Sequence, residues 1–218
     1  MVGKAKPPIT RRGAVLAAGY AGTAALAAVA LDRDEVPAAT PRPPSRDAMA
    51  RLSGYFPNPV LQTQEGKAVY FYDDLLKGKV VVLSLMYTGC GRLCPSSIAN
   101  LLEAKEGLGA RVGRDVFFYA LTLDPALDTP AVLNAYARRL ETGAGFTFLT
   151  GAEANIHLIR RRFGLFDPDP AVDADRAQHG ALAVYGNEPL GRWGAVSSLV
   201  RPERIVRAVR SLLPRETA

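Results

Sequence analysis

The sequence predicts one α/β domain built on a layered sheet, spanning residues 54–214 of the 218-residue chain. Apolar runs of buried-strand length alternate in this region with segments of helical period. The only two cysteines of the chain lie at one junction between such a strand and such a helix. About 160 residues are enough for one domain with a proper core.

The domain is expected to begin with a hairpin, because two short runs of strand residues flank a turn at Glu65-Gly66. Strands and helices then alternate. Thr129 and Pro130 mark one helix start, since Thr is a favoured N-cap and Pro a favoured first residue. In chain order we expect strands at 60–63, 68–71, 80–86, 115–123 and 145–149, helices at 95–107, 130–140 and 152–163, a polar loop at 167–178, strands at 182–185 and near Trp193 that turn at Gly186-Asn187, and a helix at 202–213.

Residues 1–31 are interpreted as a signal peptide or membrane anchor. Four basic residues precede the uncharged, alanine-rich stretch 13–31, which is the pattern of an export signal or a single span. The run A-V-A at 28–30 offers a cleavage site, so a cleaved and a retained segment are both open. The arginine pair at 11–12 leaves Sec and twin-arginine export both open. Residues 32–53 are proline-rich without apolar period, which predicts a flexible tether. We therefore expect the domain on the periplasmic side of the cytoplasmic membrane.

The net charge of +6 belongs mainly to that leader. Of the 27 lysines and arginines, four lie in residues 1–30, which leaves 23 against 21 acidic residues. A balanced domain of this kind gives no reason to expect nucleic acid as a partner.

Cys90 and Cys94 follow the predicted strand at 80–86 and directly precede Pro95, which opens a helix. The positive end of a helix dipole favours thiolate there. Two soft sulfurs held this close can exchange electrons as a disulfide or bind a soft metal such as Cu(I). A purely structural bridge is disfavoured, because so short a loop stabilises little. A thiol pair beyond the first core strand predicts a thioredoxin-like fold with an N-terminal hairpin, although the spacing is C-x3-C and not C-x2-C.

The two histidines bear on the choice between electrons and metal. His157 lies one position off the apolar stripe of its predicted helix, so we expect it to be exposed. His179 follows the polar loop and enters a late strand. In a thioredoxin-like sheet that loop comes near the thiols. Two sulfurs and one imidazole make a three-coordinate site suited to Cu(I).

Three motifs occur in order along the domain. Residues 88–95 read T-G-C-G-R-L-C-P, residues 123–130 read L-D-P-A-L-D-T-P, and Gln178-His179 precedes a late strand. With these motifs the chain, from about Tyr55 to Leu213, resembles the Sco/SenC family. Those are thioredoxin-fold proteins that handle copper during assembly of the copper centre of cytochrome c oxidase.

The resemblance implies that Cys90, Cys94 and His179 are the copper ligands, for Cu(I) and also for Cu(II). It implies a copper-receiving oxidase subunit or another copper chaperone as partner, and a metallochaperone without enzymatic turnover. Gly91 stands where the family often has proline, and Gln178 where an acidic residue is common. Both departures change loops that a receiving protein would touch, and neither removes a ligand.

The remaining motif residues have other expected roles. Asp124 would lie near the ligands and hydrogen-bond the histidine or a bound water. Asp128 and Thr129 are explained by helix capping. Tyr87 and Trp193 are expected in the core or in a wall of the site.

Two enzymatic alternatives use the same sulfurs. A thiol–disulfide oxidoreductase would use Cys90 and Cys94 as a catalytic redox pair that keeps cysteines of a copper-receiving protein reduced. A peroxidase of the peroxiredoxin type is the least favoured, because those enzymes resemble T-x-x-C and Tyr87 holds the threonine position here.

Overall fold

The computed structural model describes residues 54–175 and 180–214. The predicted leader, the predicted tether and His179 lie outside these ranges. Within them, every helix is too short or too polar to cross a membrane.

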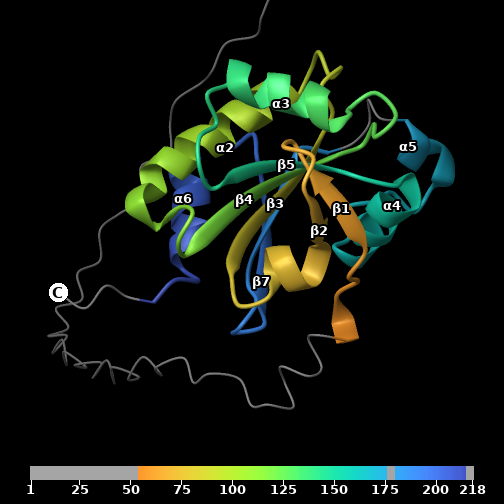
Figure 1. Ribbon diagram of the computed structural model, residues 1–218. Coiled ribbons are helices and arrows are strands. Elements are labelled where there is room, and N and C mark those ends of the chain that lie inside the picture. The colour runs from red at the N-terminus through yellow and green to blue at the C-terminus, as the bar shows by residue number, and fades with distance from the viewer. Residues whose placement is uncertain (1–53, 176–179, 215–218) are drawn as a thin grey trace, which may run out of the picture. The chain divides into compact units, whose positions relative to one another are not determined.

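One mixed sheet of seven strands forms the centre of the domain, in the order β2-β1-β5-β4-β3-β6-β7 (Figure 1). The three middle strands β5, β4 and β3 are parallel to one another, and the remaining pairs are antiparallel. The strands are β1 (Val60–Thr63), β2 (Ala68–Tyr70), β3 (Val80–Met86), β4 (Val116–Thr122), β5 (Phe146–Thr150), β6 (Leu182–Asn187) and β7 (Arg192–Ser197). The predicted α/β class and the hairpin β1–β2 are confirmed.

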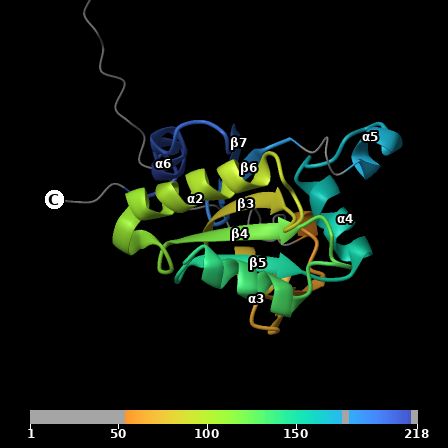
Figure 2. The same ribbon diagram turned by 90° about the horizontal axis from the view of Figure 1, so that it is seen from above.

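Helices cover both faces of the sheet, and each face has its own apolar core. Figures 1 and 2 show α2 (Cys94–Leu108), α3 (Pro130–Arg139) and α6 (Pro202–Arg210) over one face. The other face is covered by α4 (Glu153–Arg162) and by η1 (Phe71–Leu76), a π-helical turn. Strand β3 serves both cores, since Val80 and Val82 point to the first and Val81 and Leu83 to the second. The remaining short elements are η2 (Gly109–Arg111) and α5 (Pro170–Ala174).

The predicted turn at Gly186-Asn187 is wrong, because both residues belong to β6. Gly186 pairs with Trp193 across the ladder, and a Cβ at Gly186 would lie 2.0 Å from Trp193 Cε3. The glycine therefore makes room for the indole ring and does not form a turn. The chain reverses after Asn187, and Gly191 at its end has a φ of 60°.

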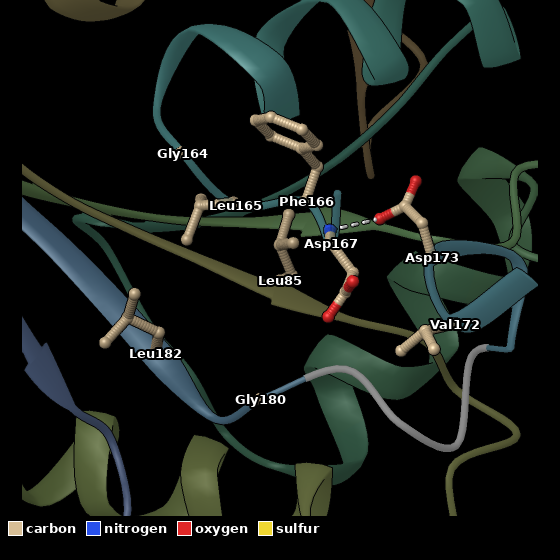
Figure 3. A pocket seen from close by; sticks show the side chains of 9 residues that line it. All are labelled: Leu85, Gly164, Leu165, Phe166, Asp167, Val172, Asp173, Gly180 and Leu182. Atoms are coloured by element: carbon tan, nitrogen blue, oxygen red, sulfur yellow. Dashed lines mark hydrogen bonds between the residues drawn. The ribbon is translucent and has the colours of Figure 1, made fainter. Parts of the chain in front are cut away.

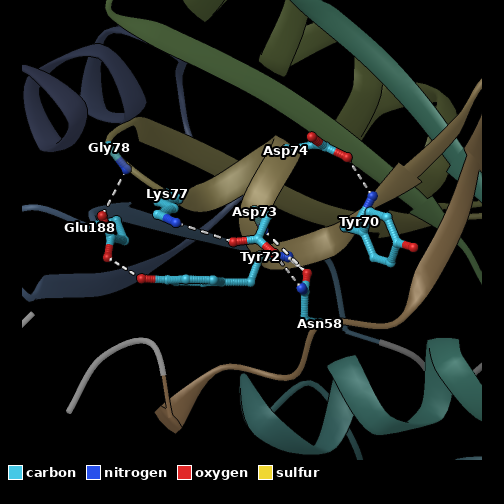
Figure 4. Close-up of polar contacts among 8 residues, drawn as sticks. All are labelled: Asn58, Tyr70, Tyr72, Asp73, Asp74, Lys77, Gly78 and Glu188. Atoms are coloured by element: carbon cyan, nitrogen blue, oxygen red, sulfur yellow. Dashed lines mark hydrogen bonds and ion pairs between the residues drawn. The ribbon is translucent and has the colours of Figure 1, made fainter. Parts of the chain in front are cut away.

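A buried carboxylate fastens η1 to the end of β6 (Figure 4). Glu188 is fully buried and accepts hydrogen bonds of 2.8 Å from the Tyr72 hydroxyl and from the Gly78 amide. Burial and then this contact with Glu188 raise the pKa of Tyr72 to about 12. The same figure shows Asn58 accepting the Tyr72 amide at 2.8 Å. The segment between β2 and β3 is thus held in place by these hydrogen bonds.

The predicted polar loop at 167–178 contains α5, which Asp169 caps by accepting the Ala171 amide at 2.9 Å. Arg160 of α4 pairs with Asp173 of α5 and also donates to the Leu165 carbonyl at 3.1 Å. These contacts hold the segment that follows α4 against the body of the domain.

Candidate metal centre

The two cysteines lie where the parallel part of the sheet meets the first long helix. Strand β3 ends at Met86, a loop follows, and α2 begins at Cys94 with Pro95 in its first turn. Proline costs nothing at this position, because the first amides of a helix have no partner within it. The loop turns tightly, with the Cys90 amide donating to the Tyr87 carbonyl at 3.2 Å.

Both cysteines are free thiols and half-buried. Burial raises the pKa of the Cys90 thiol, but hydrogen bonds from the Cys94 thiol and the backbone amides of residues 92–94 outweigh it. The pKa of Cys90 falls to about 7. Burial, followed by the hydrogen bond with Cys90, raises the pKa of Cys94 to about 12. Cys90 therefore loses its proton first, in the neutral pH range, while Cys94 keeps its own.

A pocket of 160 Å³ opens beside the thiols. Its lining is mostly apolar, and Tyr87 forms part of its wall as expected. Three separate chain segments meet there, because Leu123 and the pair Gly180-Ala181 line the pocket together with the segment that carries both cysteines. Gly180 is the residue directly after His179.

A second cavity of 140 Å³ adjoins this pocket (Figure 3). The two share Leu85 and Gly180 as lining residues. Its other wall is the segment after α4, where the Asp167 amide donates to Asp173 at 2.8 Å. The contacts of Asp173 thus hold the chain a few residues before the position of His179.

The other residues that the sequence analysis considered for the site do not lie together in the structure. His157 is exposed on α4, as predicted. Trp193 belongs to the core and not to the wall of the site, since its ring packs 4.8 Å from that of Phe56 and 5.5 Å from that of Phe163. Among the described residues no three histidine, cysteine or acidic side chains are grouped to hold a metal ion. His179, which would be the third ligand, lies outside the described ranges.

The acidic motif after β4, at residues 123–130, makes a contact that the sequence analysis did not predict. Thr129 caps α3 as predicted, accepting the Val132 amide at 3.4 Å. The capping role expected for Asp128 is wrong, because its carboxylate instead accepts the Thr88 amide at 3.1 Å. Asp124 is buried at the start of the same turn, next to Leu123 of the pocket wall. A contact across 40 residues leaves no local signal, and only the pairing of the motifs T-x-C and D-P-x-x-D hinted at it.

The thiol groups of Cys90 and Cys94 are chemically suited to bind a soft metal. Thiolates prefer Cu(I), and an apolar pocket protects the bound ion from water. The same pair can also form a disulfide, because cysteines four residues apart at a helix start can satisfy the required geometry.

Most of the chain matches one known protein family. The SCO1/SenC family model matches residues 44–213. A candidate copper-binding protein of Stutzerimonas stutzeri is 27% identical over 149 residues, which cover 67% of this chain and 72% of that protein.

Two solved structures share the fold. ScoI of Bradyrhizobium japonicum, solved with copper bound, is 26% identical with a TM-score of 0.57, over 72% of this chain and 99% of that one. BsSco, described as a member of the Sco family of cytochrome c oxidase assembly proteins, is 23% identical with a TM-score of 0.58. That match covers 71% of this chain and 90% of that one. The thioredoxin-like prediction is confirmed, and the chain belongs to the SCO1/SenC family.

Proposed function

We propose that this chain is a copper metallochaperone that assists assembly of a copper centre in a respiratory oxidase. Cys90, Cys94 and His179 are its copper ligands in this proposal. The observation that carries it is the shared pocket, which both free thiols line together with Gly180, the neighbour of His179. His179 directly precedes Gly180 in the chain, which is why it is proposed as the third ligand.

The relatives support copper as the cargo. A structure of Bradyrhizobium japonicum ScoI holds copper, and the Stutzerimonas stutzeri relative carries copper binding in its name. Two thiolates and one imidazole suit Cu(I), and an imidazole also makes the site acceptable to Cu(II). The description of BsSco as an oxidase assembly protein supports the proposed destination.

The proposal places the domain on the periplasmic side of the cytoplasmic membrane, exported or held there by residues 1–31 through the tether at 32–53. Its partners are a copper-receiving oxidase subunit or another copper chaperone. The basic leader and the proline-rich segment support this location.

A Cu(I) titration of the reduced protein against a chelator of known affinity tests the ligand set. His179→Ala should weaken Cu(I) binding by orders of magnitude, since losing a whole ligand should cost more than the roughly 10–100-fold that losing a partner of a ligand costs. Any copper that stays bound should be two-coordinate by X-ray absorption. The matched control is His157→Ala, which removes the exposed histidine of α4 and should bind like the unaltered protein. Equal effects of the two substitutions would refute the assignment of His179.

A thiol–disulfide oxidoreductase is the alternative function, and the unequal thiols favour it. A thiolate at Cys90 beside a protonated Cys94 is the arrangement of an attacking and a resolving thiol. Both functions need the cysteines, because oxidation to the disulfide removes both sulfur ligands.

Oxidase assembly in cells that lack the unaltered protein separates the two functions. A metallochaperone needs His179, so His179→Ala should fail to restore oxidase activity while its dithiol still cycles. A reductase needs only the sulfurs, so the histidine variant should restore activity and Cys90→Ser should not. Full rescue by His179→Ala would favour the oxidoreductase.

A further inference from the structure

The buried carboxylate of Asp128 reaches the loop that carries Cys90. Asp128 is 1% exposed, and its oxygens accept the Thr88 amide at 3.1 and 3.3 Å. The hydroxyl of Thr88 donates to the same carboxylate, and so does the hydroxyl of Thr122 at the end of β4. A charge buried this deeply is tolerated because several donors point at it.

These contacts form one side of a clamp around Tyr87. On the other side, the amide of Leu123 donates to the Met86 carbonyl at 2.8 Å. Leu123 and Asp128 stand at the two ends of one short turn. That turn therefore binds the chain at Met86 and at Thr88, on either side of Tyr87. The Tyr87 carbonyl accepts the Cys90 amide.

Helix capping does not account for Asp128. The first turn of α3 is already capped by the neighbouring Thr129. The turn itself is closed by backbone bonds, with the Asp128 amide donating to the Asp124 carbonyl at 2.8 Å. Besides accepting the Thr122 hydroxyl at the end of β4, the side chain adds the contact with Thr88, two residues before Cys90.

We propose that Asp128 is a positioning residue for the thiol pair, acting through Thr88. By holding the Thr88 peptide, the carboxylate fixes where the Cys90 sulfur lies relative to Cys94 and to the pocket. This inference rests on the proposed function for its copper readout. Its redox readout depends only on the presence of the two thiols.

The inference predicts changes in chemistry that ordinary destabilisation does not produce. Without the clamp the loop samples several positions, so the two sulfurs are less often placed for one metal ion. Asp128→Asn, which keeps the shape and removes the charge, should weaken Cu(I) binding about tenfold. It should also shift the equilibrium of the Cys90–Cys94 dithiol with glutathione, because the dithiol and the disulfide need different loop geometries.

The experiment compares five variants by Cu(I) competition, by glutathione equilibration and by thermal unfolding. Thr88→Val removes the hydroxyl donor and should move both chemical readouts in the same direction as Asp128→Asn, while Thr88→Ser should behave like the unaltered protein. The double variant should fall short of the sum of the single effects, because both residues act through one contact. Thr129→Ala is the matched control, since it removes the cap of α3 in the same turn. It should lower the unfolding temperature and leave the Cu(I) affinity and the dithiol equilibrium unchanged.

Two outcomes overturn the inference. One is an unaltered dithiol equilibrium and Cu(I) affinity in both Asp128→Asn and Thr88→Val. The other is a Thr129→Ala variant that changes these readouts as much as they do, which would make the turn merely structural. If the unaltered protein binds no copper, the proposed function fails, and the glutathione equilibrium still decides on Asp128. If Asp128→Asn does not fold, Thr88→Val against Thr88→Ser gives the answer.

Discussion

The backbone amide of Cys94 donates a hydrogen bond to the sulfur of Cys90, at 3.4 Å. The bond exists because α2 begins at Cys94 and its first amides have no partner within the helix. One thiol is thus stabilised as a thiolate by the helix that carries the other. This local arrangement explains why two cysteines so close together differ in acidity.

Thiol reactivity is predicted to separate the two cysteines. Because the pKa of Cys90 is lowered to about 7, its thiolate forms at neutral pH, and its alkylation rate should fall as the pH drops through 7. Cys94, with its pKa raised to about 12, should stay unmodified in that range. Iodoacetamide labelling of the reduced protein followed by peptide mass spectrometry measures both. In Cys94→Ala the midpoint for Cys90 should rise toward about 8.5, the ordinary value; an unchanged midpoint would contradict the role of the neighbouring thiol.

Removing the carboxylate of Glu188 is predicted to be costly. Glu188→Ala leaves the Tyr72 hydroxyl and the Gly78 amide without their acceptor, and each such loss costs about 1–3 kcal/mol. We expect the free energy of unfolding to fall by about 3 kcal/mol in urea titrations. Glu103→Ala, on the exposed side of α2, should change it by less than about 0.5 kcal/mol. If the free energy of unfolding fell by a similar amount in the two variants, the buried contact would not have the stabilising role predicted for it.

A methyl group at position 186 is predicted to displace the only tryptophan of the chain. In Gly186→Ala the new Cβ would overlap the ring of Trp193, so the ring must leave its packing against Phe56 and Phe163. The loss should be about 1–3 kcal/mol in unfolding free energy, with a shift in tryptophan emission. Gly54→Ala meets no atom within 4 Å and should leave the emission unchanged. A wild-type spectrum for Gly186→Ala would show that the strand can widen to admit the methyl group.

Export is predicted to depend on the leader. A fusion of alkaline phosphatase after Ser53 should be active, because the phosphatase needs the oxidising periplasm for its disulfides. The matched fusion without residues 1–31 should stay in the cytosol and be inactive. Activity in neither fusion would end the proposal of a periplasmic domain.

Much of the fold was predictable because its signals are local. The central strands and the helices between them follow from apolar period, and the start of α3 follows from Thr129, whose side chain reaches an amide three residues on. The C-x3-C pair directly before Pro95 likewise predicted a thiol site at a helix start. Such features need no knowledge of the rest of the chain.

Other features were misread or missed because their partners are distant in sequence. Gly186 has the local pattern of a turn residue, but it lies in a strand, and the ring of Trp193 from the next strand covers it. Asp128 resembled a cap, as any aspartate before a helix does, and its contact with Thr88 forms only when β3 and β4 pair. Glu188 gave no signal, since its donors lie 110 and 116 residues away.

By itself, then, the sequence determined the order of the strands and of the longer helices, the helix start beside the thiols and the soft character of the candidate ligands. These depend on side chains within a few residues of one another. Only the tertiary structure decided that Gly180 borders the thiols, that Asp128 holds Thr88 and that Glu188 holds Tyr72. Each of these contacts joins segments that the sheet brings side by side, and a buried polar group finds its partner in space and not along the chain.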